Sequence, residues 1–143
     1  MSSNKEIQSD PGQIEKDNER LLSAFEQWLG DAGLSDATVD RHVTNISFFL
    51  EHFLQYYEAV NARNGAEYVA EFLGDWFIRK AMWSSESSIK GNAASLKKFY
   101  AFLAERGEVE QHVVKDLNQT IKAGMPIWLE SMRRYMDVED DDW

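Results

Sequence analysis

The sequence predicts an all-α fold, a single orthogonal bundle of four main helices with one or two short helices at its C-terminal end. Apolar residues recur along most of the chain at the i, i+4, i+7 spacing of an amphipathic helix, and no stretch alternates with the period two of a strand. The chain has 143 residues, of which 43% are hydrophobic, 8 are glycine and 2 are proline. These values fit one domain without an interdomain linker.

Residues 1–16 are expected to form a disordered or frayed N-terminal arm, because they lack apolar periodicity and contain a Pro-Gly pair. From Asp17 onward the periodicity predicts a first helix, which Gly30 or Gly33 can end. Ser35 is suited to the N-cap of a second, longer helix, because its hydroxyl can accept a hydrogen bond from a free backbone N–H.

A third helix, with apolar residues from 69 to 77, is predicted to end near Trp83, and the serine cluster 84–88 supplies N-caps for a fourth helix. Gly107 stands where the fourth helix should end, at the C′ position that favours glycine. Shorter helices are predicted around residues 113–121 and from Pro126 onward, since a proline is tolerated in a first helical turn.

The predicted domain therefore spans residues 17–136, and residues 137–143 are expected to form an unstructured acidic tail. The aromatic side chains fall at helical spacing, so they are interpreted as core packing and not as a platform for stacking bases. They are Trp28, Phe49, Phe53, Phe72, Trp76, Phe99 and Tyr100.

Fifteen basic and 25 acidic residues give a formal net charge of -10, which argues against a nucleic-acid or anionic-membrane partner for the chain as a whole. Residues 84–136 differ, because they hold eight basic and six acidic residues, and they are the expected location of any phosphate-binding surface. The absence of cysteine excludes a disulfide scaffold and a thiol nucleophile. The polar N-terminal segment and the lack of a long apolar run favour a cytoplasmic protein without a membrane partner.

No catalytic constellation is found in the sequence. His42, His52 and His112 form no metal-ligand pair at i, i+4, and they are interpreted as surface or boundary residues. The serine cluster has neither a base nor an orienting acid nearby in the sequence, so helix capping explains it more simply than nucleophilic catalysis. No cofactor and no metal are expected.

Four segments in order resemble the SAM-like core-binding domain of tyrosine recombinases, the phage integrase family. The segments are LLSAFEQWLGDAGLS, SDATVDRHVTNISFFLEHF, VAEFLGDWFIRK and SSIKGNAASLKKFYAFLAERGEVE. In the second segment His42 stands where a tyrosine is common in the family, and the LKKFYAFLAERG piece is the most distinctive. The resemblance covers roughly 90 of the 143 residues and implies the four- or five-helix fold that clamps one side of a DNA target.

In that family a separate C-terminal domain cuts DNA with an arginine, a His-x-x-Arg pair and a tyrosine nucleophile. Here the third residue after each histidine is Asn45, Gln55 or Lys115, and about 30 residues follow the resembling part. The resemblance therefore implies a non-catalytic, DNA-binding module linked to DNA integration or recombination, either a stand-alone binding half or part of a longer recombinase, and not an enzyme.

The family places the starts of the second and fourth helices against double-stranded DNA. Helix N-termini and basic side chains suit phosphates, and asparagine can pair with adenine. The alternative interpretation is a pair of solvated polar faces with capping serines. The implied DNA-binding residues are Thr38, Arg41, His42, Asn45, Ser88, Lys90, Asn92, Lys97 and Lys98.

A second hypothesis is an acidic helical protein-interaction module that kept the fold and lost DNA binding. It would bind a partner or a second copy through the C-terminal helix, whose apolar residues can alternatively close the bundle; they are Trp128, Met132 and Met136. The two hypotheses differ in whether the cations of the second and fourth helices are free of acids. The acids in question are Asp36, Asp40 and Glu86.

Overall fold

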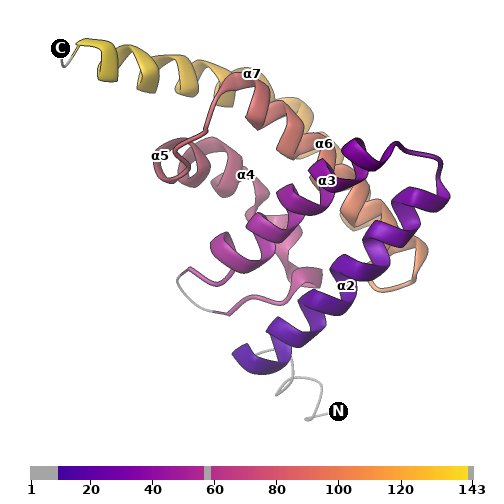
Figure 1. Cartoon of the computed structure of the whole chain (residues 1–143). Helices are drawn as coiled ribbons and strands as arrows, with labels where there is room; N and C mark the ends of the chain where they lie inside the picture. Colours follow the sequence, from indigo (N-terminus) through magenta and orange to yellow (C-terminus); the bar gives the residue numbers. More distant parts are fainter. Residues whose placement is uncertain (1–9, 57–58, 142–143) are drawn as a thin grey trace.

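The computed structural model describes residues 10–56 and 59–141, with residues 138–141 described by their backbone only, and every regular element in this part is helical (Figure 1). The predicted all-α class is thus confirmed. None of the described helices combines the length and the apolar character needed to cross a bilayer. In chain order the elements are α2 (Pro11–Asp31), α3 (Asp36–Phe48), the π-helical η1 (Phe49–Phe53), the 3₁₀-helical η2 (Ala62–Tyr68), α4 (Val69–Glu71), the π-helical η3 (Phe72–Trp76), α5 (Phe77–Lys80), α6 (Glu86–Glu105) and α7 (Gln111–Asp141).

The first helix starts earlier than the sequence predicts. Asp10 is its N-cap, with a carboxylate oxygen that accepts a hydrogen bond of 2.9 Å from the backbone N–H of Gly12, and Pro11 opens the helix. An Asp-Pro pair suits a helix start as well as a turn, because proline at the first position gives up an N–H that has no helical partner. Ile14 is buried, so residues 11–16 belong to the domain. The rest of the expected arm, residues 1–9, lies outside the described residues.

The predicted caps are confirmed. Ser35 accepts a hydrogen bond from a backbone N–H of the first turn of α3, and Ser85 forms a reciprocal capping box with Ser88 at the start of α6. Gly33 and Gly107 follow α2 and α6 with φ angles of 88° and 75°, a left-handed conformation that glycine adopts without steric cost.

The third predicted helix is present but irregular. Residues 62–80 follow one helical path that passes from a 3₁₀ turn through a short α segment and the π turn η3 to α5. The π turn widens the buried face, so that residues from adjacent helical positions all reach the core. These buried residues are Phe72, Leu73, Trp76, Phe77 and Ile78.

The two short C-terminal helices predicted from the sequence are in fact one helix, α7, with Pro126 in its interior. The apolar stripe of Leu117, Ile121, Trp128 and Met132 stays buried on both sides of the proline, so packing holds the helix continuous where the missing N–H weakens it. The backbone of α7 remains helical to Asp141, where an unstructured tail was expected.

Helix α6 lies at the centre of the packing and contacts α2, α3, η3 and α7. Its Phe99 meets Phe25 of α2 edge to face, with 5.3 Å between the ring centroids, and Tyr100 is fully buried. Six of the seven aromatics assigned to the core are buried, and Trp28 is half-buried with its indole N–H donating to Glu105 at 2.9 Å. The core interpretation of the aromatics is therefore confirmed.

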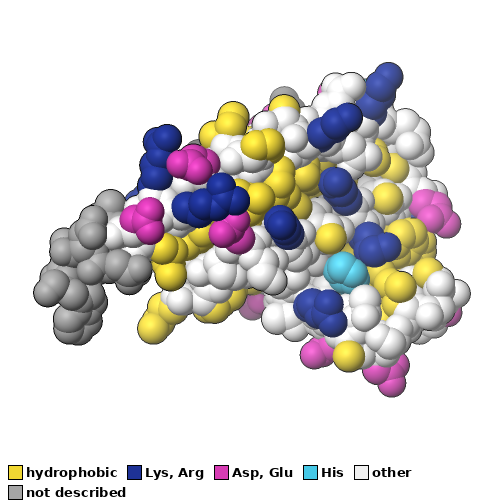
Figure 2. Space-filling model, turned by 90° about the horizontal axis from the view of Figure 1, so that it is seen from above, with side chains coloured by type: hydrophobic (Ala, Val, Ile, Leu, Met, Phe, Trp, Pro, Cys, Tyr) yellow, Lys and Arg dark blue, Asp and Glu magenta, His cyan; other side chains and the backbone are white. Residues whose placement is uncertain are grey.

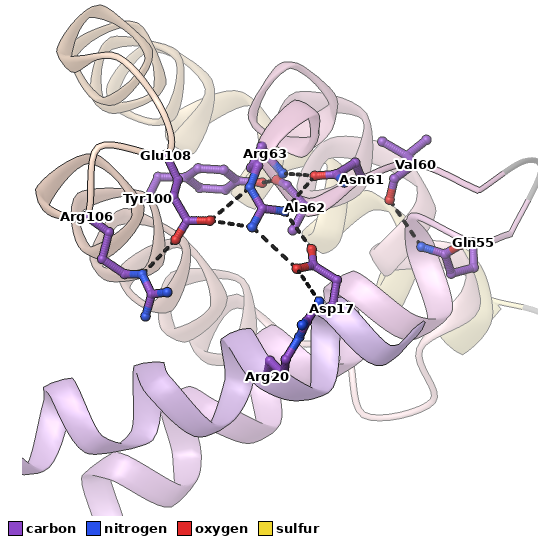
Figure 3. Close-up of polar contacts among 10 residues, drawn as sticks. All are labelled: Asp17, Arg20, Gln55, Val60, Asn61, Ala62, Arg63, Tyr100, Arg106 and Glu108. Atoms are coloured by element: carbon purple, nitrogen blue, oxygen red, sulfur yellow. Dashed lines mark hydrogen bonds and ion pairs between the residues drawn. The ribbon is translucent and has the colours of Figure 1, made fainter. Parts of the chain in front are cut away.

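An ion-pair network joins η2 to α2 and to the turn after α6 (Figure 3). The Arg63 guanidinium donates to Asp17 at 2.6 Å and to Glu108, and the hydroxyl of Tyr100 donates to the carbonyl of Ala62 at 2.6 Å. Partial burial opposes the charge of Arg63, but hydrogen bonds to both carboxylates raise its pKa above the ordinary value. The network fixes the start of the irregular segment against α2 and α6.

We predict that Gly124→Ala destabilises the fold, whereas Gly91→Ala does not. A Cβ at Gly124 would collide with the buried indole of Trp128, and that indole also lies 2.7 Å from where a Cβ at Gly74 would stand. A Cβ at Gly91 meets nothing within 4 Å. The free energy of unfolding in urea should fall by about 1–3 kcal/mol for Gly124→Ala. It should rise by about 0.5–1 kcal/mol for Gly91→Ala, since alanine favours a helix. Equal shifts in the two variants would contradict the packing of Trp128.

Candidate nucleic-acid interface

A buried polar cluster joins α3 to α6 at the centre of the candidate interface. The Ser95 hydroxyl of α6 lies 2.7 Å from Nδ1 of His42, and it accepts a hydrogen bond of 2.9 Å from the amide of Asn45. The same hydroxyl lies 3.1 Å from the carbonyl oxygen of Gly91, one turn earlier in α6. Ser95 and His42 are buried, so the cluster lies between the helices and not on their solvent side.

Two cations approach His42, one from each helix. Burial is the main cause that lowers the pKa of His42, and the positive charges of Lys98 on α6 and Arg41 on α3 lower it further. The neutral imidazole is therefore favoured in the folded state. Arg41 and Lys98 thus both lie near His42, one on each helix.

Several predicted DNA-binding side chains are engaged within the fold. Asn92 is buried and donates to the backbone carbonyl of Ser88 at 2.8 Å, and the Ser88 hydroxyl belongs to the capping box of α6. The Thr38 hydroxyl accepts a hydrogen bond of 2.9 Å from Ser35 in the first turn of α3. Together with His42 and Asn45, these side chains hold the helices in place. The sequence alone did not distinguish this structural role from contact with DNA.

The remaining predicted residues are cations on the solvent side. Arg41, Lys90 and Lys97 are exposed, Lys98 is half-buried, and none of the four takes part in an ion pair among the described residues. Figure 2 shows this face of the molecule, with lysine and arginine side chains spread across it, one histidine among them, and acidic side chains mostly toward its ends.

The acids that could neutralise these cations do not pair with them. Glu86 binds Arg133 of α7 at 2.8 Å instead of Lys90, and the ion pairs of the described residues include neither Asp36 nor Asp40. The four cations therefore keep their charge available for an anionic partner.

The starts of α3 and α6 are not adjacent to each other (Figure 1). His42 in the middle of α3 lies beside Ser95 in the middle of α6. Trp83, just before α6, lines a small cavity with His52, which follows α3. The two helices cross near their midpoints (Figure 1). Side-chain cations, and not two adjacent helix N-termini, are the source of positive charge on this face.

The cavity at this end measures about 250 Å³ and is lined by Asn45, Asn92, His52, Phe48 and Trp83, among others. Among the described residues, no group of three or more side chains is arranged to hold a metal ion. Sequence reasoning missed Ser95, although a serine between the core residues of α6 is the pattern that could have indicated a buried polar contact.

Comparison of the chain with protein-family models, with curated proteins and with solved structures finds no match.

We predict that His42 makes the fold less stable as the pH falls below about 6.5. Because the pKa of His42 in the folded state lies below its ordinary value of 6.5, the unfolded chain takes up this proton more readily. The stability that the neutral ring contributes is complete above pH 6.5 and is lost as the pH falls toward the lower folded-state pKa. The measurement is the free energy of unfolding in urea at several pH values between about 7.5 and 5.5.

The variant His42→Gln lacks the stability that the neutral imidazole contributes at high pH. The difference in unfolding free energy between the wild type and this variant should therefore shrink as the pH falls. The control is His52→Gln, which removes an exposed imidazole and leaves His42 in place, so the wild-type pH dependence should persist. A difference between wild type and His42→Gln that grows on acidification would show that the ring is protonated in the fold.

Proposed function

We propose that the chain binds double-stranded DNA without acting on it chemically, through the solvent side of α3 and α6. The observation that carries this proposal is the group of four cations, Arg41, Lys90, Lys97 and Lys98, without acidic partners among the described residues. In a chain with a net charge of -10, a local surface of this kind is the best candidate for contact with phosphates.

The shape of α6 supports close approach of a phosphate backbone. Lys90 and Lys97 are seven residues apart, so they project from one side of the helix. Gly91 and the exposed Ala94 lie between them, and a Cβ at Gly91 would meet only open space. On this side of the helix two positive charges, Lys90 and Lys97, are therefore separated by residues with small side chains.

The contacts expected from this surface are mainly to phosphates. Asn92 and His42, which the resemblance assigns to DNA, are buried, so reading of base edges by these side chains has little support. Binding should therefore be modest in affinity and sensitive to salt. The proposal includes a link to DNA integration or recombination, which the four integrase-like segments support, and a cytoplasmic location, which the polar N-terminal segment supports.

A protein-interaction function remains the second candidate, but on a different surface from the one first considered. Trp128 and Met132 are buried and close the bundle, so they do not form an exposed apolar strip with Met136. The observation that favours protein binding is an open groove between α6 and α7 that is lined mainly by apolar residues.

We predict that Lys90→Glu combined with Lys97→Glu abolishes binding to a random duplex while leaving the helical circular dichroism signal intact. The measurement is fluorescence anisotropy with a labelled duplex of about 30 base pairs, titrated at low and near-physiological salt. If all four cations contact phosphates, the wild-type slope of log K against log salt should be about -3 to -4.

The matched control is Lys16→Glu combined with Lys80→Glu, which makes the same change in net charge on α2 and α5. It should bind nearly as well as the wild type. Unchanged binding by the Lys90/Lys97 variant would remove α6 from the interface. Absence of wild-type binding even at low salt would overturn the DNA proposal and leave the protein-interaction function.

A further inference from the structure

An open groove of about 900 Å³ lies between α6 and α7, beside the proposed DNA-binding face. Its floor is apolar, and the floor residues come from both helices. They are Ala101, Val114, Ile121, Met125, Pro126 and Leu129. Ile121 is buried at the base of this floor, and the other five residues are partly or fully exposed. An open apolar floor of this kind is suited to a short segment of polypeptide with apolar side chains.

The charged residues around this groove are all cations. Lys97, Lys122 and Arg133 line it, and no carboxylate does. Arg133 is paired with Glu86 at 2.8 Å, but Lys97 and Lys122 take part in no ion pair among the described residues. Figure 2 shows hydrophobic side chains exposed between lysine and arginine side chains on this side of the molecule. The groove thus favours an occupant that combines carboxylates with apolar groups.

One segment of this chain has that composition. Residues 137–143 contain five acids, no base, and the two apolar residues Val138 and Trp143. The acids are Asp137, Glu139, Asp140, Asp141 and Asp142. Charge complementarity therefore pairs this segment with the groove.

The segment cannot enter the groove of its own molecule. The groove residues from Val114 to Arg133 and the backbone up to Asp141 belong to one continuous helix, α7, whose last turns extend past α5 (Figure 1). At 1.5 Å per residue, Asp137 lies about 18 Å further along the helix axis than Met125. The groove can receive the acidic segment only from another molecule.

We propose that the groove between α6 and α7 binds residues 137–143 of a second copy of this chain. If two α7 helices lie antiparallel about a twofold axis level with Met132, residue 137 of one copy stands opposite residue 127 of the other, and residue 141 stands opposite residue 123. Both grooves are then filled in the same way, which closes the assembly as a dimer. The proposal does not depend on DNA binding.

Sedimentation velocity of the full chain at near-physiological salt tests this proposal. The wild type should show a concentration-dependent equilibrium between monomer and dimer. The variant Asp140→Asn, Asp141→Asn, Asp142→Asn should raise the dimer dissociation constant about tenfold, because most of the negative charge that complements Lys97 and Lys122 is lost. Lys122→Glu should raise it as well, since it places an acid in the groove.

The matched control is Glu15→Gln, Glu19→Gln, Glu26→Gln, which removes the same amount of negative charge from exposed positions on α2. Relief of general repulsion would strengthen dimers in both triple variants, so a loss of dimer confined to the first one assigns the effect to the acidic segment. A peptide of residues 136–143 should dissociate the wild-type dimer. A chain that stays monomeric at high micromolar concentration, or a dimer insensitive to both the peptide and Lys122→Glu, would overturn the proposal.

Discussion

The candidate interface depends on one buried hydroxyl, that of Ser95, which joins α6 to α3. A serine hydroxyl can donate one hydrogen bond and accept two. The contacts with His42, Asn45 and the carbonyl of Gly91 use all of this hydrogen-bonding capacity. An unpaired polar group at such a buried site costs about 1–3 kcal/mol, so the cluster strongly favours one register of α3 against α6. In that register Arg41 of α3 and Lys98 of α6 both lie near enough to His42 to lower its pKa.

The second determinant is the continuity of α7. A helix that ended at Pro126 would leave α6 without the long neighbour that forms the other wall of the groove. Trp128 maintains the continuity, because its indole fills the space left by Gly74 of η3 and Gly124 of α7. The packing of this buried ring between two glycines thus determines the direction of the last third of α7, and therefore the position of the acidic segment.

Helix positions and caps could be predicted from the sequence because they are local properties. The serines at 35 and 85 and the glycine at 107 act within one turn of their own position. Pro126 was misinterpreted because a proline ends a helix by local rules, whereas here the buried residues on both sides of it decide the outcome. The burial of His42 was also beyond local reasoning, since it depends on Ser95, which is 53 residues from His42 in the sequence. The sequence identified the cations of the site, but it did not show whether neighbouring acidic side chains pair with them.

The net charge of -10 and the positive face are compatible because they act over different distances. At physiological ionic strength charges further apart than about 8 Å are largely screened, so a phosphate on α6 responds to Lys90 and Lys97 more than to acids on α2. The net charge chiefly slows the approach of an anionic partner. Lys97 belongs both to the proposed DNA-binding face and to the groove. A bound acidic segment and a bound phosphate backbone would compete for this side chain, so each occupant would weaken the other by the same factor.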